Sequence, residues 1–219
     1  MKKKKRTISH ETIKRRKTNS KKGDNGKLLI IGGSEDYTGC LALAGIAALR
    51  TGCDIVIIAA PEKTAWAINC LSPDLMTKKI KGKYFQKKHA EEIIKLSEKF
   101  DAVLIGNGIG INSKEFVKQI TKKIKKPKEI ILKNTTGNPG MTKAGTGDVL
   151  AGLTAGFLAQ GYPLNKAALN ATYINGKLGD IQKEKKGYSY IASDLIKDKE
   201  ETEKIIKKIQ KEYEKNINK

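Results

Sequence analysis

The stretch that decides the fold is residues 27–61, KLLIIGGSEDYTGCLALAGIAALRTGCDIVIIAAP. It opens with a short apolar run, residues 27–33, that ends in two glycines and is typical of a buried parallel strand. A polar loop leads into residues 39–52, which are rich in Ala and Leu, end in glycine and predict a packed helix. A second apolar run over residues 54–61 predicts another buried strand. Strand, helix and strand in this order form the crossover unit of a parallel sheet.

The rest of the chain continues this alternation. Two more strands are predicted over residues 101–110 and 129–133. Helices are predicted over residues 85–100, 113–124 (capped by Asn112 or Ser113), 147–160 and 164–178, with a charged helix beginning near residue 193. We therefore expect a three-layer α/β/α fold with a mostly parallel central sheet.

Charge is distributed unevenly along the chain. The net charge is +21, from 44 basic and 23 acidic residues. Residues 1–22 hold eleven of the basic residues and one acid, Glu11, which predicts a disordered basic arm before a single domain over residues 23–219. Weak attraction to polyanions and a plain solvated tail both stay open as interpretations of this arm. Because no nucleic-acid-binding motif accompanies it, we expect no nucleic-acid partner.

The expected cellular compartment follows from features that the sequence lacks. No apolar run approaches the roughly 20 residues that span a bilayer, and no apolar stretch follows the first basic residues as in a secretory signal. Cys40, Cys53 and Cys70 have neither CxxC nor zinc-site spacing and are expected to be reduced thiols. We expect a cytoplasmic protein with no membrane partner and with no metal held by its own side chains.

The strongest chemical signal is NPGMTKAGTGDVLAG, residues 138–152. Its GTGD core opens an apolar helix, where unpaired amides and the helix dipole favour an anion. We expect the turn Gly145-Thr146-Gly147 to hold a phosphate, and Asp148 to accept a proton from a hydroxyl that attacks phosphorus. On GTGD alone, an ordinary helix start is an equally good interpretation. The NPGM sequence just upstream favours the chemical one.

These motifs resemble those of the ADP- or ATP-dependent NAD(P)H-hydrate dehydratases, which belong to the ribokinase-like superfamily. Residues 138–152 resemble the family's C-terminal signature. KGDNGKLLIIGGSEDYTG, residues 22–39, resembles its opening strand and substrate loop, and LIGNGIG, residues 104–110, its second signature. NGKLGD at residues 175–180 and SDLI at residues 193–196 are similar to its closing pattern. The resemblance covers most of residues 22–196.

The resemblance implies a ribokinase-like fold and a repair reaction. A phosphoryl group from ADP or ATP passes to the ring hydroxyl of the S form of hydrated NADH or NADPH. Elimination of phosphate then restores NAD(P)H, and AMP remains when ADP is used. Mg²⁺ is expected on the nucleotide phosphates, and we expect a homo-oligomer.

The resemblance also implies roles for individual residues. Asp148 would be the catalytic base. The nucleotide would be contacted by Gly145, Thr146, Gly147 and Asn138. The hydrated cofactor would be approached by Tyr37, Gly39, Cys40, Ala42, Gly106 and Gly108, beside Asp148.

Two kinds of departure from the family pattern stand out. Single positions differ: Lys21 and Asn175 replace histidines, Asn107 a proline, Ala144 a glycine and Cys40 a common alanine. The chain is also short, because only the 34 residues 111–144 separate Gly110 from Gly145, which is room for one helix and one strand. The family has further strands here that approach the adenine nucleotide. We therefore expect a shortened ribokinase-like domain.

Several explanations stay open at this point. The shortened chain could complete its pocket in an oligomer, could be a relic that binds nucleotide without catalysis, or could reflect the loss of an internal segment. GTGD alone also fits a ribokinase-like kinase for a small molecule, although NPGM and the YTG loop argue against it. The shortening and the basic arm favour a third possibility, a non-enzymatic nucleotide- or polyanion-binding protein.

Overall fold

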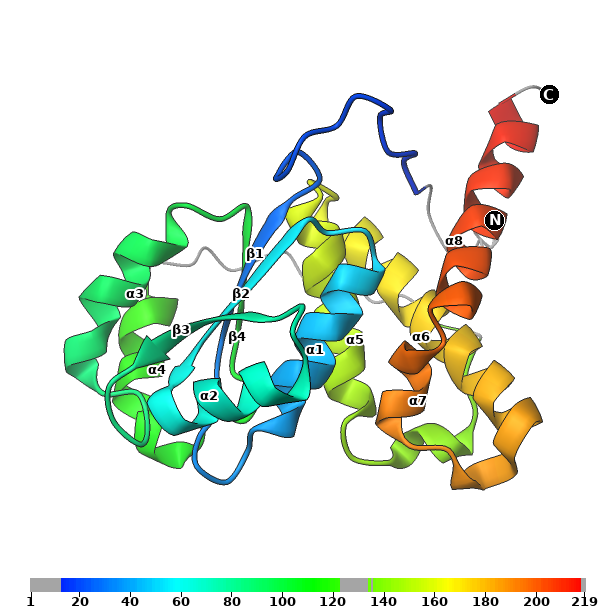
Figure 1. Ribbon diagram of the computed structural model, residues 1–219. Helices are drawn as coiled ribbons and strands as arrows, with labels where there is room; N and C mark the ends of the chain where they lie inside the picture. Colours follow the sequence, from blue (N-terminus) through cyan, green and yellow to red (C-terminus); the bar gives the residue numbers. More distant parts are fainter. Residues whose placement is uncertain (1–12, 123–133, 135, 218–219) are drawn as a thin grey trace, which may run out of the picture.

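A four-stranded parallel sheet forms the centre of the molecule (Figure 1). The structure is a computed structural model that describes residues 13–122, 134 and 136–217. The sheet has the order β3-β2-β1-β4, and all of its pairings are parallel. Its strands are β1 (Lys27–Ile31), β2 (Ile55–Pro61), β3 (Met76–Ile80) and β4 (Ala102–Ile105). The predicted parallel α/β architecture is confirmed.

Helices cover both faces of this sheet (Figure 1). The α-helices are α1 (Gly39–Arg50), α2 (Glu62–Leu71), α3 (Ala90–Ser97), α4 (Lys114–Thr121), α5 (Thr146–Ala159), α6 (Leu164–Lys186), α7 (Ala192–Lys197) and α8 (Lys199–Ile217). Short 3₁₀ helices are η1 (Lys87–His89), η2 (Ile111–Ser113), η3 (Pro139–Thr142) and η4 (Gly187–Ser189). Helices α3 and α4 lie on one face, and α1, α2 and α5 lie on the other.

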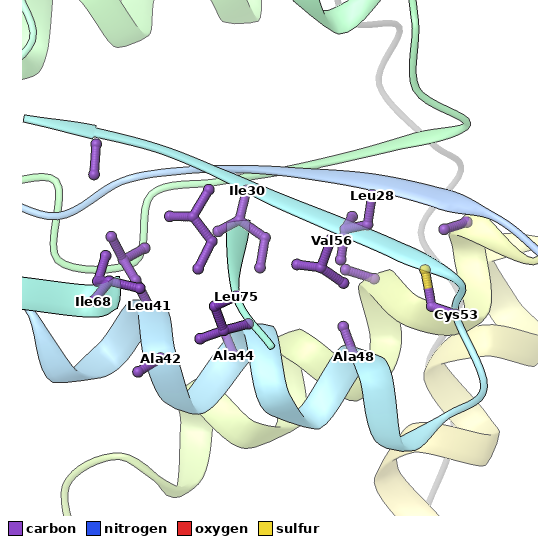
Figure 2. Packing of buried hydrophobic residues seen from close by; sticks show 14 of the residues in the cluster. Leu28, Ile30, Leu41, Ala42, Ala44, Ala48, Cys53, Val56, Ile68 and Leu75 are labelled. Carbon is purple, nitrogen blue, oxygen red and sulfur yellow. The ribbon is translucent and has the colours of Figure 1, made fainter. Parts of the chain in front are cut away.

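The side chains of β1 alternate between these two faces, as the period of a strand requires. Leu28 and Ile30 join the core cluster of α1, α2 and α5, whereas Leu29 and Ile31 join the cluster of α3 and α4. Figure 2 shows Leu28 and Ile30 above the apolar side of α1. Because both faces are covered, β1 reads as an unbroken apolar run in the sequence.

Helix α5 packs unusually close to α1. A Cβ atom added at Gly152 would lie 2.1 Å from the carbonyl oxygen of Ala44, and one at Gly156 would lie 2.8 Å from that of Ala48. The opposite side of α5 carries Val149, which packs in a further core cluster with α6, α7 and α8. The glycines of α5 therefore let one helix link the sheet layer to the outer helices.

Several predicted elements differ in detail. Residues 85–100 form η1 and the shorter α3, and α4 ends at Thr121. Ser113 does not cap α4 through its side chain; its hydroxyl donates to the carbonyl of Ile109 at 2.8 Å. The strand predicted over residues 129–133 lies outside the described residues. No pattern in the sequence indicated α2 or β3. Strand β3 alternates exposed and partly buried positions and buries only its last residue.

Residues 13–22 were predicted to belong to a disordered arm, but they contact the domain. Ile13 is buried, and the backbone amide of Lys14 donates to the hydroxyl of Tyr162. The guanidinium of Arg16 pairs with Asp54. This corrects the arm's expected boundary, because a buried side chain and an ion pair hold residues 13–16 in place; residues 1–12 lie outside the described part.

Among the described helices, none combines the length and the apolar character needed to cross a bilayer.

Candidate functional site

A tight turn leads into α5 at the carboxyl end of the sheet. Gly145 is the N-cap residue and has a φ of 92°, in the left-handed region that glycine adopts readily. The first helical hydrogen bond runs from the amide of Val149 to the carbonyl of Gly145, at 3.1 Å. The amides of Gly147 and Asp148 therefore precede the bonded part of the helix, where they favour an anion. No described non-glycine residue has a positive φ, so Ala144 fits here without strain.

The carboxylate of Asp148 is held by a residue of the loop that follows β4. Its Oδ1 atom accepts a hydrogen bond from Nδ2 of Asn107, at 2.6 Å. Asn107 stands in the loop after β4, between Gly106 and Gly108, and both of these glycines have positive φ angles. The carbonyl of Asn107 also accepts a hydrogen bond from the amide of Gly33, at 2.8 Å. One residue thus joins the loop after β4 both to the loop after β1 and to the first turn of α5.

Open space surrounds three of the predicted site glycines. A Cβ atom added at Gly39, Gly106 or Gly147 would meet no neighbouring atom within 4 Å. These glycines stand at the start of α1, at the end of β4 and in the first turn of α5. A ligand could therefore approach the backbone at each of them.

Gly108 differs from these three glycines. A Cβ atom there would lie 2.5 Å from Sγ of Cys40 and 2.7 Å from Cβ of Tyr37. Its glycine identity therefore serves close packing between two loops, and it faces protein rather than open space.

The predicted substrate loop splits into exposed and buried parts. The side chain of Tyr37 is 60% exposed, and the thiol of Cys40 donates to the carbonyl of Tyr37 at 3.6 Å. Burial, and then the negative charge of Asp148, raise the pKa of Cys40 to about 11, so its thiol is neutral near pH 7. Ala42 is buried in the core cluster beneath the sheet. Ala42 was expected to approach the hydrated cofactor with the rest of this loop, and its burial argues against that part of the expectation.

The side chains of two residues predicted to contact nucleotide hold the loop in shape. Oδ1 of Asn138 accepts hydrogen bonds from the amide of Gly140 and the hydroxyl of Tyr190, both at 3.0 Å. Its amide donates to Asp180 at 3.2 Å. The hydroxyl of Thr146 donates to the carbonyl of Met141 at 2.8 Å. Both side chains are therefore engaged within the protein, and the backbone of Thr146 is what remains for a phosphate.

The residues that support this loop on its buried side were not predicted from the sequence. Tyr190 is fully buried, and its burial raises the pKa of its hydroxyl. Nζ of Lys143 donates to the carbonyl of Tyr190, at 2.6 Å. A Cβ atom at Gly140 would lie 2.8 Å from the Tyr190 hydroxyl, so the loop packs directly on this ring. No local sequence signal marks these partners, because about fifty residues separate them.

The described residues contain no group of three or more His, Cys, Asp or Glu side chains that could hold a metal ion. A site for a bare divalent ion is therefore not built from side chains in this part of the protein. A metal bound to nucleotide phosphates has different requirements, since phosphate oxygens and water supply most of its ligands.

Comparison with known proteins adds a consistent picture. The model of a family described as NAD(P)H-hydrate dehydratase matches residues 28–125 and 116–201. A bifunctional NAD(P)H-hydrate repair enzyme of Methanothermobacter thermautotrophicus is 32% identical, over 84% of this chain and 51% of its own length. An ADP-dependent (S)-NAD(P)H-hydrate dehydratase of Cenarchaeum symbiosum is 27% identical, over 82% of this chain and 89% of its own.

Solved structures share the fold. An ADP/ATP-dependent NAD(P)H-hydrate dehydratase of Bacillus subtilis, crystallised with ATP and Mg²⁺, superposes with a TM-score of 0.73 at 20% identity. The superposition covers 90% of this chain and 95% of that one. A ribokinase-like protein of Enterococcus faecalis gives a TM-score of 0.74, with 93% of each chain covered. The predicted ribokinase-like fold is confirmed.

The chain is shorter than the curated relatives with which it was compared. The chain spans about half the length of the first curated relatives that it matches. The alignment with the Methanothermobacter enzyme extends over 263 residues, which exceeds the 219 residues of this chain. That alignment therefore contains positions for which this chain has no residue.

Proposed function

Because the chain belongs to the NAD(P)H-hydrate dehydratase family, we propose that it repairs hydrated NADH and NADPH, in the S form, using ADP or ATP. The observation that carries this proposal is the placement of Asp148. Its carboxylate lies in the first turn of α5, the helix that begins after the left-handed Gly145. The carboxylate is oriented by Asn107. Open space at the backbone of Gly39, Gly106 and Gly147 supports the approach of ligands to these turns.

The first chemical step is phosphoryl transfer. Asp148 accepts the proton of the ring hydroxyl as the oxygen of that hydroxyl attacks the terminal phosphorus of the nucleotide. The new O–P bond forms while the bond to the nucleotide breaks, which releases AMP from ADP or ADP from ATP. The amides of Gly147 and Asp148 face the migrating phosphoryl group, where fixed donors stabilise growing negative charge.

The second step is elimination. The C–O bond of the phosphorylated ring breaks and its electron pair leaves with phosphate, while the neighbouring ring carbon gives its proton to water and the C–H electron pair forms the new double bond. The ring regains its double bond, so NADH or NADPH is restored. Phosphate is a better leaving group than hydroxide, which is the reason to spend a nucleotide on a dehydration.

The support differs between the residues that we propose for the site. Gly39, Gly106, Gly145 and Gly147 offer backbone to a ligand, and Tyr37 offers an exposed ring. Cys40 lies close enough to Asp148 for the negative charge of that carboxylate to raise the pKa of the thiol. We propose that the neutral thiol of Cys40 lines the part of the site that binds the hydrated cofactor. Mg²⁺ would enter with the nucleotide and neutralise phosphate charge, since the described side chains form no cluster of their own for it.

We also propose that the protein is a homo-oligomer. The short connection over residues 111–144 leaves the adenine and ribose of the nucleotide with few groups from this chain. We propose that a second copy of the chain completes this part of the pocket, as a homo-oligomer. Native mass spectrometry with and without ADP tests this, because the oligomer should be more abundant when the nucleotide is bound.

An activity assay tests the main proposal. S-form hydrated NADH is incubated with ADP or ATP and Mg²⁺, and the return of the NADH absorbance band is followed. Wild-type protein should restore the band, and Asp148→Asn should be slower by about 100-fold or more. Asp74→Asn is the matched control, since Asp74 is exposed and lies outside the site. Equal rates for Asp148→Asn and wild type would contradict the proposed role of the base.

The same assay, together with thermal unfolding, distinguishes the other candidate functions from the repair reaction. A small-molecule kinase would leave hydrated NADH unchanged and consume ATP with an alcohol of the thiamin-pathway type. A binding protein without catalysis would raise its melting temperature with nucleotide but restore no absorbance.

A further inference from the structure

A large cavity lies at the amino-terminal end of the sheet, away from Asp148. Its volume is about 1030 Å³, and its walls come from residues 13–20, the end of α1, the end of α5 and one side of α8. In Figure 1 the described chain starts beside α8 and arches over this upper end before entering β1. Gln160, which lines the cavity, follows Asp148 by twelve residues along α5, so the two are about 18 Å apart at 1.5 Å per residue.

The cavity is strongly basic. Seven basic and three acidic residues line it. Arg16 pairs with Asp54, and Lys207 pairs with Glu203 at 2.7 Å. Within the described part of the chain, no carboxylate forms an ion pair with Lys17, Arg50 or Lys199. Cations around one hollow that have no carboxylate partner attract a multiply charged anion.

The floor of the cavity is held in place by hydrogen bonds. Nε of half-buried Arg50 donates to the carbonyl of Ile196 at 3.2 Å, which fixes the plane of its guanidinium. Nε2 of Gln160 donates to the hydroxyl of Thr51 at 2.8 Å. A fixed guanidinium loses little freedom when it binds an oxyanion, and its planar fork suits phosphate.

One wall of the cavity is the segment before β1. The burial of Ile13 and the hydrogen bond from the Lys14 amide to Tyr162 anchor that segment. Its turn is closed by a hydrogen bond from the hydroxyl of Ser20 to the carbonyl of Lys17, at 2.8 Å. The lysine-rich segment therefore carries its charges over the hollow.

We propose that this cavity is a second ligand site, which binds a multiply phosphorylated small molecule independently of the repair reaction. Its volume lies just above the roughly 300–1,000 Å³ usual for small-molecule sites, so it takes a nucleotide-sized ligand rather than a single phosphate. Among its described lining residues Tyr162 is the one aromatic, and that ring is buried against Phe157 at 5.4 Å. A single-stranded RNA would need exposed rings for stacking, so a small molecule is favoured.

Calorimetric titration with inorganic triphosphate, at moderate salt, tests the proposal on two charge-matched double variants. Lys17→Glu with Lys199→Glu reverses two cations of the cavity. Lys95→Glu with Lys99→Glu makes the same change in net charge on exposed lysines around α3. The cavity variant should bind triphosphate at least about tenfold more weakly than wild type at one site, because facing like charges cost more than the 1.4 kcal/mol of a tenfold change. The α3 variant should bind like wild type.

Three results would overturn the proposal. Equal binding by both double variants would place the triphosphate elsewhere, including at the turn beside Asp148. An absence of saturable binding to wild-type protein would show that the basic hollow takes no small phosphorylated ligand. Displacement of triphosphate by a short RNA of much higher affinity would assign the surface to nucleic acid. Thermal unfolding of both variants checks that each is folded before it is titrated.

Discussion

The side-chain amide of Asn107 donates a hydrogen bond to the carboxylate of Asp148, with Nδ2 and Oδ1 2.6 Å apart. This contact ties the end of β4 to the start of α5. It leaves the second carboxylate oxygen for a substrate hydroxyl. The position is a departure from the family motif, which has proline here, and a proline could not donate this bond.

Removing that hydrogen bond should slow catalysis more than it weakens binding. A hydrogen bond to a charged group contributes about 1.5–3 kcal/mol, so Asn107→Ala should lower kcat by about 10- to 100-fold. The KM for hydrated NADH should change little, because Asn107 positions the base rather than the substrate. Asn107→Asp should be at least as slow, since it cannot donate and adds a like charge beside Asp148.

Steady-state kinetics of these variants, beside the exposed Asn112→Ala as a control, check this expectation. A rise in KM with kcat unchanged would mean that Asn107 contacts the substrate instead. Unfolding in urea should show that Asn107→Ala loses no more than the about 1.5–3 kcal/mol of this bond and stays folded under the assay conditions, which separates positioning from unfolding.

Two glycines of the turn should respond differently to the same substitution. Gly145→Ala forces a left-handed φ of 92° on alanine and brings its Cβ within 2.8 Å of Leu43 and Ala192. Such strain costs about 1–3 kcal/mol, so the free energy of unfolding should fall. Gly147→Ala meets open space and improves helix propensity, so it should leave stability unchanged or higher.

Gly147→Ala should impair activity although it does not lower stability. Its new methyl group would stand where we place the phosphate, so the KM for ADP or ATP should rise by about tenfold. Nucleotide titrations and urea unfolding of both variants measure the two effects. An unchanged nucleotide KM in Gly147→Ala would argue against phosphate binding at this turn.

The contact between α1 and α5 should be sensitive to one methyl group. A Cβ at Gly152 would lie 2.1 Å from the Ala44 carbonyl oxygen, so the two backbones would have to separate. Overpacking of this kind costs about 1–3 kcal/mol or more. Gly152→Ala should therefore unfold at lower urea concentration than Gly147→Ala, which introduces the same residue in the same helix. Equal midpoints would mean that the helices are not so closely packed.

Cysteine alkylation measures the electrostatic link between Cys40 and Asp148 without any substrate. The pKa of Cys40 is raised to about 11, by burial first and by the charge of Asp148 second. Because the thiolate is the reactive form, labelling by iodoacetamide should be slow at pH 8 and should rise toward pH 11. Exposed Cys70 should be labelled first and serves as the internal reference.

Asp148→Asn removes one cause of that raised pKa, so Cys40 should be labelled faster than in wild type at the same pH. Peptide mass spectrometry over a pH series gives both rates. An identical rate in the two proteins would show that the thiol does not lie near this carboxylate.

The sequence predicted the parts of this protein whose signals are local. The apolar runs of β1 and β2 are continuous because both faces of the sheet are covered. The GTGD motif indicates the start of α5 through local residues alone. Strand β3 stayed hidden because it buries little beyond Ile80 and carries Lys78 and Lys79.

The missed site features depend on contacts between distant segments. Asn107 reaches Asp148 across 41 positions of the chain, and Asn138 meets Tyr190 across 52. Ala42 belongs to the matched substrate loop by its position in the sequence, yet the helix that begins at Gly39 turns its methyl group into the core. Periodicity within one segment contains none of this information.

One measurement addresses the repair chemistry most directly: the fate of the ring hydroxyl oxygen. S-form hydrated NADH is prepared with isotopically heavy oxygen in that hydroxyl and is converted with ADP and Mg²⁺ by wild-type protein and by Asp148→Asn. If the hydroxyl is phosphorylated before it leaves, mass spectrometry will find the heavy oxygen in inorganic phosphate, formed by wild type far faster than by the variant. Heavy oxygen in water, or equal rates for both proteins, would contradict the account.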